Sequence, residues 1–560
     1  MKKILLGTMF LCGTIAMSGC SDFFDVQTDN VLDNDEYITE ENEVYSGYIG
    51  LMTKMQAIGD KVIYLNEVRG EMVKPTAFAP SELYNIYNYE DDLTGNSYAD
   101  PAGYYELLNG CNDYLRKLKD YKDTHTLNDS YYRSLVSSTL RIKAWTFMTL
   151  AKTYGKVVWV DKPMDSLRDL SQFKTLDLDE TMAACKNMLD IGYDGVDGTY
   201  DISWQEWLDP STAGTTDSPY RDWDNITPPY YAVYAEICLW LGQYQRCIDV
   251  IQDFMNNELY QQRSQAKFLR GAWLHGKFST FWGEGSEYNY EVASAISYDS
   301  SNRQTNNLLK HFGIESPNEY WLAPSEAGMA RFTDDTFTPL GTEEQDWRTS
   351  GTFREYDGQW VISKFRAPGS SKPAYEDDVR VYTYRGADMY LMMAEAFNQL
   401  GKPEAVDALI NNGVEAYKEE FDVDADGVYS GEWNGFTPCW TSDKTNYLVS
   451  GAIEITTRGN NYVDLGLRGV DTHGVGARTF TADKRANDEE IMKEMMIEMS
   501  CEGKVYPALI RMARRYNDPS FMAQIIGEKY EETGNAAEIR AKIMNGDYFI
   551  NWDLKTDEKK

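Results

Sequence analysis

The chain has 560 residues, 42% of them hydrophobic, and its 54 basic and 89 acidic residues give a formal net charge of −35 at pH 7. A charge of this size repels nucleic acid and anionic lipid, which argues against both as partners. The hydrophobic fraction is large enough for a folded core, which excludes an acidic disordered chain.

The first 20 residues have the features of a bacterial lipoprotein signal. Lys2 and Lys3 precede an apolar run over 4–17, which is too short to cross a bilayer because a spanning helix needs about 20 residues. Small residues then precede Cys20 in the sequence Met-Ser-Gly-Cys, which resembles a lipobox. We therefore predict that 1–19 is a signal peptide and that Cys20 carries the lipid that anchors the protein. An ordinary secretory signal is the alternative.

Apolar residues recur with helical periodicity along much of the remaining chain. The strongest helix predictions are residues 101–121, 129–154, 178–191, 229–241, 243–257, 385–400, 403–418 and 488–515.

Three of these helices run into a glycine, namely Gly155, Gly242 or Gly401. Glycine accepts the left-handed backbone of a helix C-cap, and after the second and third glycines a new amphipathic helix begins at once. Ala235 and Ala394 stand seven residues before those two glycines and allow close helix approach. This pattern is typical of tetratricopeptide-type hairpins. We expect a mainly α fold, in which 20–560 form a single domain of helical hairpins with long irregular loop insertions and a few short strands.

The insertions around 64–100 and 259–382 are rich in Tyr, Trp, Gly, Ser and Asn and have little helical rhythm. Residues 288–298 alternate well enough to predict a strand. Loops that a scaffold positions commonly carry function, so we expect the ligand-binding face in these two insertions.

Aromatic side chains are the main positive signal, because 40 tyrosines and 14 tryptophans exceed what a helical core needs. Flat rings flanked by Asn, Asp and Arg suit sugars, whose C–H faces stack while their hydroxyls form hydrogen bonds. For any single ring, packing of the loop is the commoner role, but we expect two or three to reach a ligand. The predicted ligand-binding residues are Tyr84, Tyr87, Tyr89, Trp282, Tyr288, Trp321 and Trp347, with Tyr290 and Trp360 in the same loops.

Motifs for catalysis are absent from the sequence: it has no nucleophile elbow, zinc-protease motif, phosphate loop or dinucleotide fingerprint. Its four histidines are far apart, and its cysteines outside the signal lie scattered in apolar patterns, where we expect them to pack as small hydrophobic residues. We therefore predict a binding protein that requires no cofactor. A glycoside hydrolase stays open as an alternative, because two carboxylates at the right distance suffice for that chemistry.

An acidic segment offers one metal-binding possibility. Asp422, Asp424 and Asp426 have the spacing of a calcium loop, but its twelfth position is Trp433, with Glu432 one place early. The segment predicts either a Ca²⁺ site or an acidic turn without an ion.

Three segments resemble the SusD/RagB family of outer-membrane nutrient-binding lipoproteins. They are residues 141–160, 382–417 and 490–514. The residues that carry the resemblance are Arg141, Ala144, Tyr154 and Gly155 in the first segment; Arg385, Ala387, Asp388, Ala394, Glu395, Ala396, Leu400 and Gly401 in the second; and Glu494, Glu498, Glu502 and Gly503 in the third.

The resemblance implies a tetratricopeptide-like scaffold held at the outer face of the outer membrane through Cys20. It also implies a SusC-like TonB-dependent transporter as partner, over which the lipoprotein sits as a lid. The implied function is capture of glycans and their delivery to the transporter, with no bond made or broken. Some relatives capture oligopeptides, so a peptide cargo is the alternative.

Overall fold

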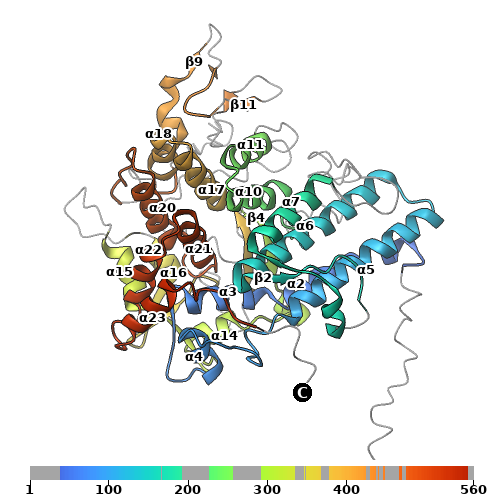
Figure 1. Cartoon of the computed structure of the whole chain (residues 1–560), viewed down its shortest axis with the longest axis horizontal. Coiled ribbons are helices and arrows are strands. Elements are labelled where there is room, and N and C mark those ends of the chain that lie inside the picture. Colours follow the sequence, from blue (N-terminus) through green and yellow to red (C-terminus); the bar gives the residue numbers. More distant parts are fainter. Residues whose placement is uncertain are drawn as a thin grey trace, which may run out of the picture.

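The computed structural model describes residues 38–164, 167–191, 226–255, 292–334, 346, 348–366, 378–423, 429–436, 439–440, 446–447, 466–468 and 475–552. The described part is mainly helical, with short two-stranded ladders, which confirms the predicted fold class (Figure 1).

Helices from both halves of the chain form the scaffold. In the N-terminal half they are α2 (Glu41–Gln56), α3 (Gly59–Arg69), α4 (Ser81–Tyr87), α5 (Ala102–Thr124), α6 (Asp129–Tyr154), α7 (Leu178–Ile191), α10 (Tyr230–Trp240) and α11 (Tyr244–Met255). In the C-terminal half they are α17 (Gly386–Gln399), α18 (Pro403–Asp407), α20 (Lys484–Glu498), α21 (Val505–Tyr516), α22 (Ser520–Glu528) and α23 (Ala536–Met544).

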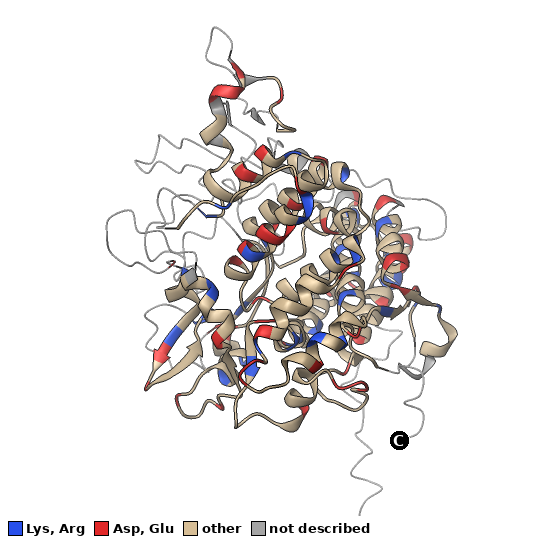
Figure 2. Cartoon of the chain, turned by 60° about the vertical axis from the view of Figure 1, so that its left-hand side comes forward, with Lys and Arg blue, Asp and Glu red and all other residues tan. Residues whose placement is uncertain are grey.

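Consecutive helices pack on one another in the pairs α5–α6, α6–α7, α7–α10, α10–α11, α20–α21, α21–α22 and α22–α23, and α17 packs on α11, α18 and α20. The long helices α5 and α6 run side by side in Figure 1, and the C-terminal helices gather on the other side of the molecule. Basic and acidic residues are interleaved along these helices (Figure 2). Buried apolar side chains from both halves form one contiguous core.

The predicted hairpin glycines have the expected backbone. Gly155, Gly242 and Gly401 have φ angles of +70°, +69° and +76°, which are the left-handed conformations of a helix C-cap. Ala235 and Ala394 are fully buried in the helices that precede the second and third of these glycines.

Two predicted helices are interrupted. The predicted helix 488–515 is two helices, α20 and α21, because Cys501 and Gly503 between them have φ angles of +64° and +74°. A Cβ atom on Gly503 would lie 2.6 Å from the Val62 carbonyl oxygen, so the close approach of α3 also requires glycine there. The predicted helix 403–418 ends its α-helical part at Asp407 and continues as a π-turn and a 3₁₀ segment, η5 (Ala408–Asn412) and η6 (Val414–Glu420).

The insertions carry short elements. These are β1 (Val73–Pro75), β4 (Val292–Ser297), η3 (Ser300–Asn302), α14 (Leu308–Phe312), β5 (Leu322–Pro324), α15 (Glu326–Asp334), α16 (Arg348–Thr352), β6 (Phe353–Tyr356), β7 (Gln359–Ile362) and β8 (Arg380–Arg385). The remaining short elements are β2 (Lys156–Val158), η1 (Leu167–Gln172), β3 (Thr175–Asp177), β9 (Asp422–Val423), β10 (Tyr429–Ser430), β11 (Cys439–Trp440) and β12 (Asn446–Tyr447).

In the described part all ladders are antiparallel pairs: β1–β5, β2–β3, β4–β8, β6–β7, β9–β10 and β11–β12. The strand predicted within 288–298 is confirmed by β4, which pairs with β8. Among the side chains that the structure describes, the cysteines are free and buried, as their apolar sequence context indicates: Cys111, Cys185, Cys238, Cys247 and Cys501.

Candidate ligand-binding face

The two aromatic-rich insertions meet in a short ladder. Strand β1 of the first insertion pairs with β5 of the second, with Pro75 opposite Leu322. The backbone contact continues beyond the strands, because the Thr76 N–H donates to the Trp321 carbonyl at 2.8 Å. The Thr76 hydroxyl donates to the Tyr320 carbonyl at 2.5 Å. Segments more than 200 positions apart in the sequence are thereby fixed side by side.

A β-hairpin extends this junction. Strands β6 and β7 are joined by Asp357 and Gly358, whose φ angles of +48° and +78° suit the primed turns of two-residue hairpins. The Tyr320 hydroxyl donates to the Trp360 carbonyl at 2.9 Å, which ties β7 to the segment before β5. Val361 packs against Tyr320 on the same side. Three adjoining segments, 76–78, 320–324 and 353–362, therefore form one surface region, which we call the junction face.

The junction face exposes aromatic rings. Phe78 is 70% exposed, Trp360 41% and Tyr356 38%. Within the described residues the other exposed large apolar side chains are aliphatic and lie elsewhere, at Ile49, Leu400 and Met544. Tyr356 and Trp360 point to opposite faces of the hairpin, because Tyr356 pairs with Gln359 while Trp360 pairs with Glu355. Phe78, Tyr356 and Trp360 thus lie on segments of the junction face.

A stack of rings supports this face from inside. His311 on α14 lies between Tyr64 and Trp321, with ring centroids 5.4 and 4.3 Å away. Tyr64 Oη and His311 Nδ1 are hydrogen-bonded at 2.7 Å. Burial lowers the pKa of His311 to about 4, so the imidazole is neutral at physiological pH and serves as a packing element. The rigid stack fixes the segment that leads into β5.

The structure divides the predicted ligand-binding residues into three groups. Tyr84 and Trp321 are half-buried. Trp321 belongs to the junction face, and the Tyr84 hydroxyl donates to the Thr76 carbonyl of that face at 2.9 Å. Tyr87 and Tyr89 are buried. The Tyr87 ring packs 4.5 Å from the ring of Tyr530, and the Tyr89 hydroxyl donates to the Arg69 carbonyl at 2.5 Å.

Their burial removes Tyr87 and Tyr89 from the set of ligand contacts, because neither ring presents a face to solvent. The physical reason is that α4 lies against the core, where a tyrosine buries its ring and satisfies its hydroxyl with a carbonyl. The third group lies outside the described residues and stays predicted: Trp282, Tyr288, Tyr290 and Trp347, together with the lipid-attachment residue Cys20.

Sequence reasoning missed Phe78 and Tyr356. Phe78 is a single apolar ring in the sequence Thr-Ala-Phe-Ala-Pro, which gives no periodicity. Tyr356 directly precedes the Asp-Gly pair of the hairpin turn. An Asp-Gly pair flanked by alternating residues is a strong hairpin signal, so this element could have been predicted.

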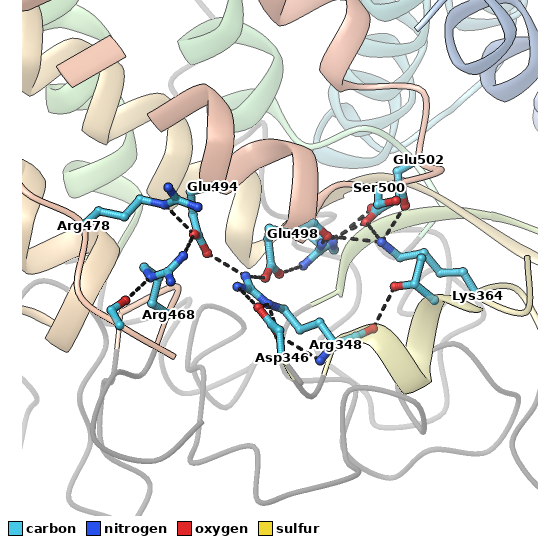
Figure 3. A network of polar contacts seen from close by, with 12 residues as sticks. Asp346, Arg348, Lys364, Arg468, Arg478, Glu494, Glu498, Ser500 and Glu502 are labelled. Atoms are coloured by element: carbon cyan, nitrogen blue, oxygen red, sulfur yellow. Dashed lines mark hydrogen bonds and ion pairs between the residues drawn. The ribbon is translucent and has the colours of Figure 1, made fainter. Parts of the chain in front are cut away.

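A network of buried ion pairs lies behind the junction face (Figure 3). Its acidic members are the three glutamates of the third resemblance segment together with Asp346, which pairs with Arg348 at 2.7 Å, and Glu490, which pairs with Arg478 at 3.1 Å. Arg348 Nη1 lies 2.6 Å from Glu494 Oε1 and 2.9 Å from Glu498 Oε2. Arg385 contacts both Glu498 Oε1 and Glu502 Oε1 at 2.8 Å. Arg468 and Arg478 also pair with Glu494.

The same network clamps the hairpin at both ends. Arg348 stands in α16 directly before β6, and Lys364 follows β7. The Lys364 ammonium lies 2.8 Å from Glu502 Oε1 and donates to the Ser500 carbonyl at 2.7 Å. Burial alone would raise the pKa of Glu502, but Arg385, Lys364 and Lys504 beside it lower the pKa to about 2. The carboxylates of Glu494, Glu498 and Glu502 are buried, so they position the hairpin rather than touch a ligand.

The predicted calcium loop is described only in part. Asp422 is exposed and lies in β9 opposite Ser430, whereas Asp424 and Asp426 lie outside the described residues. Trp433, at the twelfth position of the loop, stacks on Tyr417 at 4.6 Å. In the part of the chain that the structure describes, no group of three or more His, Cys, Asp or Glu side chains could hold a metal ion. The calcium site therefore stays a prediction.

Among the helices of the described ranges, none combines the length and the apolar composition that crossing a bilayer demands.

Comparison with known proteins shows which proteins the chain is similar to. The sequence profile of the SusD family matches residues 280–413, which include β4 through β8 and α17. The SusD-like protein P38 of Formosa agariphila is 21% identical over 451 residues, which cover 74% of this chain and 82% of that protein.

Solved structures show the same fold. A SusD superfamily protein from Bacteroides vulgatus superimposes with a TM-score of 0.60 at 14% identity, covering 91% of this chain and 93% of the other. A SusD-like carbohydrate binding protein from the same species has a TM-score of 0.51 at 13% identity, covering 84% of this chain and 83% of the other. The profile match, the relative and the shared fold agree in pointing to similarity with the SusD family.

Proposed function

We propose that this protein is a surface lipoprotein of the outer membrane that captures glycans on its junction face and passes them to a SusC-like TonB-dependent transporter. Cys20 carries the lipid anchor, and the protein itself performs no catalysis. The observation that carries the proposal is the exposure of three rings, Phe78, Tyr356 and Trp360, on adjoining segments that are fixed by hydrogen bonds and by the buried network.

Physical chemistry supports a sugar ligand at such a face. An exposed aromatic ring costs free energy in water unless a partner covers it, and the C–H face of a sugar ring is such a partner. The SusD-like carbohydrate binding protein from Bacteroides vulgatus shares the fold, which supports the same class of ligand here.

Affinity electrophoresis against a panel of polysaccharides tests the proposal. We expect at least one polysaccharide to retard the wild-type protein, and we expect Phe78→Ala to reduce that retardation. Met544→Ala is the matched control, because Met544 is 49% exposed on α23, outside the three segments of the junction face. Retardation of both variants equal to wild type would contradict the proposed site.

The same assay separates glycan capture from the two alternatives. Reducing ends that accumulate during incubation with the bound polysaccharide would show a glycoside hydrolase. Peptides that co-purify with the protein and its transporter, with no polysaccharide bound, would show a peptide cargo.

The membrane anchor has its own test. We expect labelled palmitate to enter the wild-type protein and surface display on intact cells to be lost in Cys20→Ala. Display of Cys20→Ala at the wild-type level would contradict the anchor.

A further inference from the structure

A small, mostly apolar pocket opens beside the exposed ring of Tyr356. Arg354, Tyr356 and Val361 line it from the face of the hairpin opposite Trp360, because side chains alternate along each strand. Further lining residues come from α14 and from the segment that follows it. The pocket therefore adjoins the junction face.

The lining of this pocket favours an uncharged ligand group. Arg354 and Arg366 each form an ion pair with Glu315, at N–O distances of 3.5 and 3.4 Å, so the charged side chains are engaged within the protein. Aliphatic side chains make up much of the remaining lining, and such side chains suit a methyl group and disfavour a charge. They are Leu309, Ile314, Val361 and Ile362.

One amide in the lining has no hydrogen-bond partner among the described residues. Both polar atoms of the Asn318 side chain, Nδ2 and Oδ1, are buried and unpaired. A Cβ atom on Gly313 would lie 2.5 Å from Asn318 Nδ2, so glycine at this position leaves room for the amide. Because an unpaired buried amide is unfavourable, a ligand group that offers both an acceptor and a donor gains affinity there.

The size of the pocket limits the ligand group further. One water molecule needs roughly 10–15 Å³, so the pocket volume of about 20 Å³ holds a small substituent but not a sugar ring. A hydroxyl group would leave the aliphatic lining uncovered. An acetamido group meets every requirement, because it has a methyl group for the aliphatic side chains, a carbonyl acceptor and an N–H donor.

We propose that this pocket is an acetamido subsite, which makes a glycan with 2-acetamido-2-deoxy sugars the preferred ligand. This inference rests on the proposed function and names its class of ligand. The sugar ring covers the exposed part of Tyr356, which is 38% exposed at the pocket. The acetyl carbonyl accepts a hydrogen bond from Asn318 Nδ2, and the acetamido N–H donates to Asn318 Oδ1.

Calorimetric titration with two matched probes tests the subsite. Chitopentaose and cellopentaose have the same β-1,4-linked backbone and differ in the group at C2, which is acetamido in the first and hydroxyl in the second. We expect chitopentaose to bind about tenfold or more tightly. Acetylated xylan compared with plain xylan measures the response to an O-acetyl ester, which offers the carbonyl acceptor without the N–H donor.

Variants of the amide give the preference a structural cause. Asn318→Ala removes both hydrogen-bonding atoms and should abolish the preference for chitopentaose. Asn318→Asp keeps the shape of the side chain but replaces the donor with an oxygen that repels the acetyl carbonyl, so the preference should be lost here too. Asn306→Ala is the control and should keep it, because Asn306 is also a half-buried asparagine of this insertion but does not line the pocket. Thermal unfolding shows that each variant is folded.

Several outcomes would overturn the subsite. Chitopentaose that binds no more tightly than cellopentaose, or not at all, refutes it, and the proposed function stands if another polysaccharide of the panel binds. A preference that survives in both Asn318 variants refutes it as well. A preference for acetylated xylan alone would assign the pocket to O-acetyl esters, and Asn318-dependent binding of N-acetyl-trialanine alone would assign it to peptides. If no polysaccharide of any kind binds, the proposed function fails together with the subsite.

Discussion

The buried ion network and the junction face are adjacent regions that differ in burial: the network consists of charged side chains in the interior, and the junction face exposes apolar rings to solvent. In the network, Glu494, Glu498 and Glu502 are almost fully buried and their contacts with arginine and lysine are short. On the junction face, aromatic rings are exposed to solvent. The hairpin 353–362 belongs to both regions, because the network holds its ends and solvent surrounds its tip.

The difference shows what Glu494, Glu498 and Glu502, the glutamates that carry the resemblance, do in this chain. These glutamates fix the position of a hairpin, and the residues that would touch a ligand lie at the other end of it. In this chain the scaffold and the proposed contact surface are therefore separate sets of side chains.

The largest expected effect is on stability. Glu498→Ala leaves Arg348 and Arg385 buried without one of their carboxylates, and breaking such a buried pair costs about 3–5 kcal/mol. Urea unfolding measures the loss. Glu489→Ala on the same helix is the control, because its partner Arg485 is 3.4 Å away at the surface and such pairs contribute about 1 kcal/mol or less. Equal losses in the two variants would show that the network does not hold the fold.

The second-largest expected effect is a loss of stability at low pH, because acid protonates a carboxylate of the network. The pKa of Glu502 is lowered to about 2 from an ordinary value of 4.5, so its stabilisation is fully present above pH 4.5 and is lost as pH falls through 2. The size of the loss is about 3 kcal/mol, at 1.36 kcal/mol per pH unit. Unfolding free energies measured from pH 5 to pH 2 check the prediction. A constant stability over that range would contradict it.

The contribution of the buried Glu67 carboxyl group to stability should have the opposite pH dependence. Burial and the neighbouring Glu71 raise the pKa of Glu67 to about 8. Its favourable contribution is present below pH 4.5 and is lost as pH rises through 8, because the charged form is then forced into the core. Glu67→Gln keeps the acceptor for the Gly503 N–H and should stabilise the protein by about 1–3 kcal/mol above pH 8. A gain that is largest at pH 4 would invert the assigned sign.

The smallest expected effect is that of Tyr84→Phe, which tests whether Tyr84 belongs to the ligand-contacting part of the junction face. Tyr84→Phe removes the hydrogen bond to the Thr76 carbonyl and should cost about 1 kcal/mol of stability. Glycan affinity should fall only slightly, because Tyr84 positions the loop that carries Phe78. Unfolding and titration together measure both effects. A loss of affinity as large as that of Phe78→Ala would show that Tyr84 itself contacts the glycan.

Much of the scaffold could be predicted because an amphipathic helix leaves a periodic pattern of apolar residues within a short stretch of sequence. Apolar periodicity placed α5, α6 and α7 within a few residues, and the C-cap glycines marked where the hairpins turn. The break at Cys501 and Gly503 was not predicted, since the apolar rhythm runs through it and only the approach of Val62 explains it.

The candidate site could be predicted in its region but not in its residues. Their Tyr- and Trp-rich composition predicts that the two insertions form the ligand-binding face, and the pairing of β1 with β5 joins them. Exposure, however, depends on contacts between distant segments: Tyr87 and Tyr89 are buried against residues far along the chain or on α3, while Phe78, a few positions earlier, is exposed. Such contacts between distant segments cannot be predicted from the local sequence.

Calorimetric titration of the bound polysaccharide into the double variant Phe78→Ala/Trp360→Ala tests the central claim most directly. The account predicts saturable binding by wild type without shortening of the polysaccharide, and loss of binding by at least about tenfold in the double variant. Its unfolding free energy should be unchanged, because both side chains are exposed. Wild-type affinity in the double variant would contradict capture of glycan by the exposed rings.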